Sequence, residues 1–246
     1  MAQDTFAQTH VGSMAAVELS LAAGCTAVAT LVTVTTLTAC GIAVGLGHII
    51  DRSHNFPYIS DCSVHQPERF VFRAGYGLTA AALILMLPAV RAAAEALRGP
   101  SRSVAVATRV GQLGTLALTV VAAASELREP LHLAAAAVFF LGMGVFMLPI
   151  LIAFAGPEEG QQRRFRLRLV CLVIYAASFV VMGLIPWGDL CQRSMEWVAF
   201  ATLQMFFLSL RADLSNWKAA VVQLSVAEQD AVIDSQNDSL LGISSH

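Results

Sequence analysis

Residues 130–157 read PLHLAAAAVFFLGMGVFMLPILIAFAGP and contain no Asp, Glu, Lys or Arg. A helix needs about 20 consecutive, mostly apolar residues to cross the hydrocarbon core of a bilayer, because burying an ionised side chain there costs several kcal/mol. This stretch is long enough and apolar enough. It therefore predicts a transmembrane helix.

The same pattern recurs along the chain. Five further stretches lack charged residues: 19–50, 74–90, 110–125, 169–188 and 197–210. The shorter ones reach the required length only if the charged residues that flank them lie at the membrane interfaces. The sequence thus predicts an all-α polytopic membrane protein, a six-transmembrane-helix bundle. The expected helices cover about residues 20–48, 71–94, 104–125, 131–154, 167–185 and 195–210.

Composition supports this class of protein. Charged residues make up 13% of the chain and hydrophobic residues 57%, whereas a soluble domain has about 25% charged residues. The formal net charge is -2, and no basic helix or aromatic platform is evident. The sequence therefore excludes an ordinary soluble domain and predicts no nucleic-acid partner.

Three segments are expected. Residues 1–19 form a polar tail, residues 20–215 the six-span domain, and residues 216–246 a Ser-, Asp- and Gln-rich tail of disordered composition. The loop 49–70 within the domain holds two prolines and several aromatic residues, unlike a Gly/Ser-rich flexible linker. It predicts a structured cap between the first and second helices. Within the first helix, Gly41 and Gly45 are four residues apart and predict close contact with a neighbouring helix.

The distribution of Arg and Lys predicts the orientation. Ten of them fall on the side of the N-terminus and five on the other side, which favours cytosolic N- and C-termini. Four belong to one basic run: Arg163, Arg164, Arg166 and Arg168. This run has two interpretations, a determinant of topology or a binding site for anionic lipid headgroups.

Two residue types raise further hypotheses about the external side. Cys62 and Cys191 are the two cysteines outside the predicted spans, so we expect them to form a disulfide. Four histidines are expected on the same side: His48, His54, His65 and His132. Structural hydrogen bonding, pH sensing and metal binding are all open to them. Their spacing matches no known metal motif, so no metal site is predicted.

The cap carries a recognisable signature. The segments Pro57-Tyr58-Ile59-Ser60-Asp61 and Pro67-Glu68-Arg69-Phe70 resemble the external loop of the Frag/DRAM/Sfk family of six-span membrane proteins. That family includes the damage-regulated autophagy modulators and the N-terminal domain of the yeast cell-wall-hydration protein. Matches also occur at Leu131-His132, Glu196-Trp197 and Asp213. Ser63 stands where the autophagy modulators have glycine.

The resemblance implies a set of functional residues: Pro57, Ile59, Ser60, Asp61, Pro67, Glu68, Arg69, His132, Glu196, Trp197 and Asp213. We expect Glu196 to pair with an arginine of the outer loops. The family implies a non-enzymatic protein that regulates membrane lipid organisation, lipid-linked signalling or autophagy. Its expected place is an endomembrane, lysosomal or Golgi, or the plasma membrane, with membrane lipids or a membrane or cytosolic protein as partners.

Two alternatives stay open. One is a GPI-anchor-type lipid-remodelling enzyme that uses His65, Glu68 and His132, and the other is a lipid transporter or scramblase. The sequence has no nucleophile elbow, no zinc-protease motif and no phosphate-binding loop. It therefore predicts no catalytic residue and no cofactor.

Overall fold

The computed structural model describes residues 18–49, 57–124, 130–185, 190–215 and 217–220. The predictions for residues 1–17, 50–56 (with His54) and 221–246 lie outside this part of the chain. The chain divides into two units, Ser20–Trp217 and a second formed by its two ends, Met1–Leu19 with Lys218–His246. Two short strands, β1 (Glu18–Ser20) and β2 (Lys218–Ala220), pair with each other.

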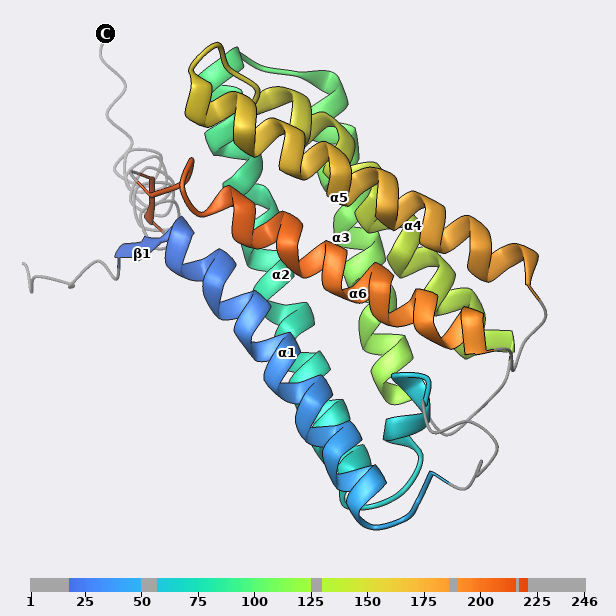
Figure 1. Ribbon diagram of the computed structural model, residues 1–246. Coiled ribbons are helices and arrows are strands. Elements are labelled where there is room, and N and C mark those ends of the chain that lie inside the picture. Colours follow the sequence, from blue (N-terminus) through green and yellow to red (C-terminus); the bar gives the residue numbers. More distant parts are fainter. Residues whose placement is uncertain (1–17, 50–56, 125–129, 186–189, 216, 221–246) are drawn as a thin grey trace, which may run out of the picture. The chain divides into compact units, whose positions relative to one another are not determined.

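Six long helices account for most of the larger unit (Figure 1). They are α1 (Leu21–Gly45), α2 (Glu68–Arg98), α3 (Arg102–Ala123), α4 (Pro130–Ala153), α5 (Glu159–Leu184) and α6 (Leu190–Leu210), with one 3-10 turn, η1 (Ser60–Ser63), in the cap. The all-α prediction is confirmed. The largest difference is at α5, which begins at Glu159 although it was expected to begin near residue 167. The Gln and Arg residues between these points favour helix, and the one glycine, Gly160, lies in the first turn, outside the helix interior.

Five of the helices, α1 to α5, are long and apolar enough to cross a membrane. Helix α6 is less apolar because Arg193 and Glu196 lie in its first two turns, yet its 21 residues span about 31 Å, the thickness of a hydrocarbon core. The Leu21 N–H donates to the Trp217 carbonyl at 3.1 Å, so the chain enters and leaves the bundle at the same end (Figure 1). That arrangement requires an even number of crossings, and α6 provides the sixth.

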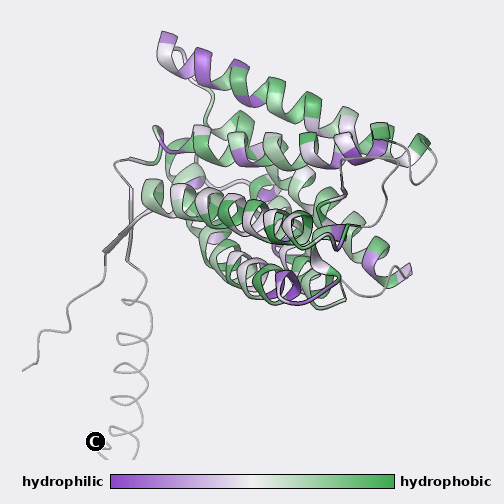
Figure 2. Ribbon diagram, turned by 60° about the horizontal axis from the view of Figure 1, so that its bottom comes forward, coloured by the Kyte–Doolittle hydropathy of each residue, from purple (hydrophilic) through white to green (hydrophobic). Residues whose placement is uncertain are grey.

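The outside of the bundle is hydrophobic. Hydrophobic residues line the lengths of the helices, and hydrophilic ones gather near several of their ends (Figure 2). Large apolar side chains are more than half exposed on the outer faces, among them Leu37, Leu85, Leu113 and Ile152. In water such a surface would aggregate. Buried hydroxyls, by contrast, donate to the carbonyl four residues earlier, as in Thr36, Thr79, Thr108 and Thr115. The protein is therefore an integral membrane protein.

Two pairs of helices approach closely through glycine. A Cβ atom on Gly142 of α4 would lie 2.9 Å from the Gly114 Cα atom of α3, and one on Gly75 of α2 would overlap the Thr35 side chain of α1. The prediction for Gly41 and Gly45 is wrong, because no described atom lies within 4 Å of a Cβ built on either. Glycine spacing along one helix does not reveal which face meets a neighbour.

Candidate functional site

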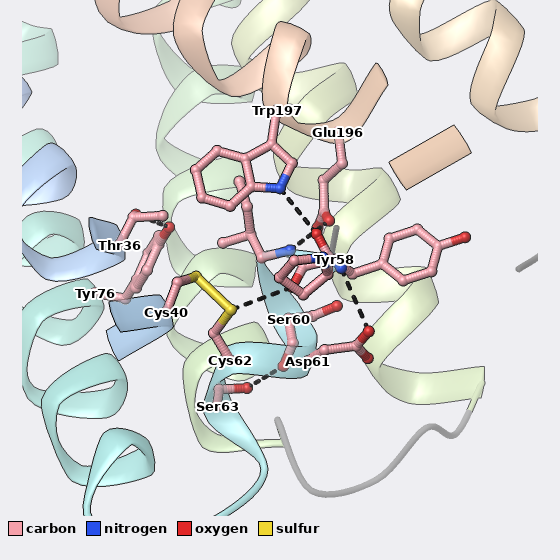
Figure 3. The surroundings of a disulfide bond; sticks show 12 residues. Thr36, Cys40, Tyr58, Ser60, Asp61, Cys62, Ser63, Tyr76, Glu196 and Trp197 are labelled. Carbon is pink, nitrogen blue, oxygen red and sulfur yellow. Dashed lines mark hydrogen bonds between the residues drawn. A yellow bond between two sulfur atoms is a disulfide. The ribbon is translucent and has the colours of Figure 1, made fainter. Parts of the chain in front are cut away.

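Helix α6 holds the cap through two side chains that reach toward it (Figure 3). The Trp197 indole N–H donates to the Pro57 carbonyl at 2.9 Å, and the Glu196 carboxylate accepts the Ile59 backbone N–H at 2.8 Å. Glu196 was expected to pair with an arginine, but the partner found is a backbone amide. A carboxylate accepts equally well from either donor, so residue type alone did not identify the partner. Four of the family-motif residues thus meet in one junction between the cap and α6.

Within the cap, Asp61 and Ser60 shape the turn η1. The Asp61 carboxylate accepts the Tyr58 backbone N–H at 3.3 Å, and the Asp61 N–H donates to the Tyr58 carbonyl at 3.1 Å. The Asp61 side chain and the Asp61 N–H therefore both bond to the backbone of Tyr58, three residues earlier, and close the turn. Ser63 is fully buried and its hydroxyl donates to the Ser60 carbonyl at 2.5 Å. Serine, unlike the glycine of the autophagy modulators, therefore adds a hydrogen bond to this turn.

A disulfide joins the cap to α1, but its partners differ from those expected. Cys62 pairs with Cys40, whose Cα atom lies 4.7 Å away, so the Cys62–Cys191 prediction is wrong. Cys40 falls inside a charge-free stretch, which by itself predicts a place within the membrane. The structure places it near the end of α1, where the helix meets the cap (Figure 3). Cys191 is exposed at the start of α6.

Replacing Cys40 by alanine is expected to lower the free energy of unfolding by about 3 kcal/mol, because the disulfide closes a 22-residue segment. Thermal unfolding of the purified protein measures this loss. Cys191→Ala is the control and leaves the midpoint unchanged. A linked Cys62–Cys191 peptide after non-reducing digestion would contradict the assignment.

Around this disulfide the cap has a small core. Cys40, Ala43 and Cys62 are buried together, and Ile49 and Trp197 pack against them. Trp197 therefore contributes both apolar contact and the hydrogen bond to Pro57. The junction is built from α1, the cap and α6, three segments that are far apart in the sequence.

Replacing Glu196 by leucine leaves the buried Ile59 N–H without its acceptor. The expected cost is about 1–3 kcal/mol, together with faster proteolysis of the cap. Glu196→Gln is the matched control, because its amide oxygen still accepts the N–H. Limited proteolysis and thermal unfolding compare the two variants. Equal behaviour of the leucine and glutamine variants would show that this hydrogen bond does not hold the cap.

The second signature segment forms the start of α2. Glu68 is fully buried, and one of its carboxylate oxygens lies 2.6 Å from Nδ1 of His48. The rings of His48 and His65 are 5.0 Å apart. Pro67 and Arg69 belong to the first turn, in which the Arg69 N–H donates to the His65 carbonyl at 2.8 Å. His48, His65 and Glu68 thus meet at the junction of α1 and α2.

A cavity of about 240 Å³ lies beside the cap, between α4, α5 and α6. The residues at its cap end are polar: Tyr58, Ser60, His132, Gln192 and Glu196. The remaining lining is mostly apolar: Leu133, Ala136, Ala137, Phe140, Phe179, Met182 and Gly183. His65 and Glu68 do not line it, so the three residues of the enzyme hypothesis are not brought together here.

Hydrogen bonds fix the polar end of the cavity. The Tyr58 hydroxyl donates to the Gln192 side-chain oxygen at 2.8 Å, and the Gln192 amide donates to the Met182 carbonyl at 2.9 Å. His132 is 9% exposed, and its Nδ1 has no hydrogen-bond partner among the residues that the structure describes. Sequence reasoning missed Gln192, because the sixth helix was expected to begin after it.

Asp213 belongs to a separate cluster at the opposite end of the bundle. Its carboxylate accepts from Nε of Arg164 at 2.9 Å and forms a short ion pair with Arg168. Arg168 is fully buried and also donates to the Ser209 hydroxyl at 2.9 Å and carbonyl at 2.7 Å.

The lipid-headgroup interpretation of the basic run is therefore wrong for Arg168. Arg164 and Arg168 are four residues apart and share the helix face toward α6. Arg163 and Arg166 lie on other faces and are exposed. These two are the arginines of the run that remain accessible to a headgroup.

Comparison with known proteins agrees with this architecture. A family model, described as the Frag1/DRAM/Sfk1/Cwh43P N-terminal domain, matches residues 21–217. No curated protein and no solved structure gives a significant match. The matched region contains all six helices, the cap and Asp213, and it covers most of the chain. This integral membrane protein therefore belongs to the Frag1/DRAM/Sfk1/Cwh43P N-terminal domain family.

Proposed function

We propose that this protein is a non-enzymatic regulator of membrane lipids and that it acts by binding a lipid in the cavity beside the cap. The observation that carries the proposal is the division of the cavity lining, polar at the cap and apolar along α4 and α5. A lipid has the same division. Its polar end matches the cap end, and its hydrocarbon matches the apolar wall.

The volume of the cavity is sufficient for one end of a lipid molecule but not for the whole molecule. A volume of about 240 Å³ is below the range of about 300–1,000 Å³ that is common for small-molecule sites. From His132 to Phe140 the wall of α4 descends two helical turns, about 12 Å. The Tyr175 hydroxyl of α5 donates to the Phe140 carbonyl at 2.8 Å and ties the two helices together at that depth. The rest of the hydrocarbon would extend into the bilayer.

Binding in this cavity would be communicated to the cap. Glu196 lines the cavity and also accepts the Ile59 N–H, and Tyr58 of the cap lines it too. An occupant that moved either side chain would change how the cap is held. The cap could then report lipid occupancy to a partner protein, which is a regulatory role.

The geometry favours this role over the two alternatives. In the enzyme hypothesis His132 acts together with Glu68, but Glu68 pairs with His48 and lies away from the cavity. A transporter needs a polar path through the bundle, whereas the cavity among α1, α2, α3, α4 and α6 has about 30 Å³ and a mostly apolar lining. That volume holds about one or two waters.

The topology proposed with this function places both termini in the cytosol and the cap on the lumenal or external side, as the excess of Arg and Lys favours. The membrane would be an endomembrane or the plasma membrane. The lipid end at the cap would then belong to the non-cytosolic leaflet.

The test fills the cavity. Ala137→Phe places a ring among the lining residues, while Val138→Phe adds a ring to the next residue of α4, which is 42% exposed on the outer face. Native mass spectrometry of the purified protein is expected to detect a retained lipid with wild type and Val138→Phe and to lose it with Ala137→Phe. The lipid profile of cells that lack the protein should be restored by the first two and not by the third. Retention of the same lipid by Ala137→Phe would refute the proposal.

A further inference from the structure

Glu196 brings an unpaired carboxylate oxygen to the cavity. One of its two oxygens accepts the Ile59 N–H at 2.8 Å. The other makes no hydrogen bond or ion pair with any residue that the structure describes, and it is not enclosed by protein, unlike the buried and unpaired oxygen of Glu68. Because Glu196 lines the cavity, this second oxygen is the part of its carboxylate that a bound molecule can reach.

The charges around the cavity favour a cation. Among Asp, Glu, Lys and Arg, the lining contains Glu196 alone. Two further charged residues flank Tyr58 with opposite signs: Asp61 accepts the Tyr58 N–H at 3.3 Å, and the Arg193 guanidinium lies 5.0 Å from the centre of the Tyr58 ring. Neither of them lines the cavity. The charge that an occupant meets is therefore the negative charge of Glu196, which attracts a cation and repels an anion.

An alkylammonium group, –NH₃⁺, meets both requirements. It carries a positive charge and it only donates hydrogen bonds, as the side chain of lysine does. It can therefore donate to the unpaired oxygen of Glu196 and to the hydroxyl oxygen of Ser60, another lining residue. An alcohol could make the same hydrogen bonds but would leave the carboxylate without a counterion.

The lining becomes apolar directly beyond this polar end. Along α4 the lining residues that follow His132 are Leu133, Ala136, Ala137 and Phe140. A phospholipid that bears an amine has its phosphate between the amine and the chains, so the phosphate would lie against these apolar side chains. Burying a charge that is neither paired nor hydrogen-bonded is costly. The order of the lining thus fits an amine that is joined to hydrocarbon without a phosphate.

We infer that the cavity selects a long-chain amine, the chemistry of a sphingoid base, and that Glu196 binds its ammonium group. This inference rests on the proposed lipid-binding function and adds the lipid class and the residue that recognises it. The two oxygens of Glu196 then have separate partners, the Ile59 N–H of the cap and the amine of the lipid. Binding of the amine is thereby linked directly to the residue that holds the cap.

The test compares amphiphiles that differ only in the polar group. Full-length protein in phosphatidylcholine vesicles is exposed to an amine, an alcohol, a carboxylate and a phosphocholine that carry the same photoreactive alkyl chain. Labelling is normalised to the amount of each probe in the vesicles. We expect the amine to label peptides of α4 and α5 most strongly, and the alcohol about tenfold less, the loss of one hydrogen bond between charged groups. Unlabelled sphingosine should compete with the amine probe.

Replacing Glu196 by glutamine assigns the selectivity to its charge. The amide oxygen still accepts the Ile59 N–H, so the cap is retained while the negative charge is removed. Amine labelling is expected to fall about tenfold, and alcohol labelling to change by less than about twofold. The alcohol probe therefore reports that the cavity of the variant is intact. Glu95→Gln is the matched control, because Glu95 pairs with Arg91 and does not line the cavity.

The outcomes separate the inference from the function on which it rests. If the four probes label equally or the amine labels least, while Ala137→Phe still blocks labelling, the amine inference is wrong and lipid binding stands. Amine selectivity that persists in Glu196→Gln would also contradict the inference. If Ala137→Phe leaves labelling by every probe unchanged, both are wrong. Amine selectivity that is lost in Glu196→Gln and kept in Glu95→Gln supports both.

Discussion

Replacing Asp213 by alanine is expected to prevent most of the protein from reaching its folded state. The substitution removes the carboxylate that Arg164 and Arg168 share, and it leaves the fully buried guanidinium of Arg168 without a counterion. Breaking a buried ion pair from one side costs about 3–5 kcal/mol, because the remaining charge stays out of water. The remaining contacts of Arg168 include two hydrogen bonds to Ser209 and the face of the Phe154 ring, and none of these supplies a negative charge. The yield and thermal midpoint of the purified protein measure the loss.

Two further variants establish that an uncompensated charge causes this loss. Adding Arg168→Met to Asp213→Ala removes the buried charge as well, and it should recover part of the stability. Arg166→Met changes an exposed arginine of the same helix and should have little effect. A double variant no more stable than Asp213→Ala alone would exclude the buried charge as the cause.

Replacing Gly142 by valine is expected to have a comparably large effect on the packing of α3 against α4. Even the first carbon of a side chain at Gly142 would lie 2.9 Å from the Gly114 Cα atom and 2.9 Å from the Val110 carbonyl oxygen. Both are backbone atoms, so no rotamer change relieves the overlap, and the helices must separate. Overpacking of a core costs about 1–3 kcal/mol where side chains can adjust, and this site should lie at the upper end or beyond it.

The control for this prediction is another glycine of the membrane domain. Gly41→Val places a side chain where no described atom lies within 4 Å, so the fold should tolerate it. Thermal unfolding and the fraction of monodisperse protein after purification compare the two variants. If both behave alike, steric overlap between α3 and α4 is not what makes Gly142 sensitive.

Much of the candidate site could be predicted from the sequence. The motif residues that the sequence identifies lie close together in the structure. Pro57, Ile59, Glu196 and Trp197 meet at one junction, although about 140 residues separate the two halves. The cavity itself could not be predicted from the sequence. His132 was identified, but Gln192, Phe140 and Phe179 are ordinary residues of a membrane helix, and their convergence depends on how α4, α5 and α6 are rotated.

The class of the protein, a six-span pattern and the family could all be predicted from the amino-acid sequence. The class and the expected spans follow from the exclusion of charge from the bilayer, which acts on each helix separately. The family follows from the resemblance of the cap and helix-end motifs. Three features could not be predicted and are known from the structure: Cys62 pairs with Cys40, Arg168 is buried against Asp213, and Gly142 rather than Gly41 contacts another helix. Hydropathy fixes where a helix lies in the membrane but not its rotation about its own axis. That rotation is set by contacts among all six helices at once.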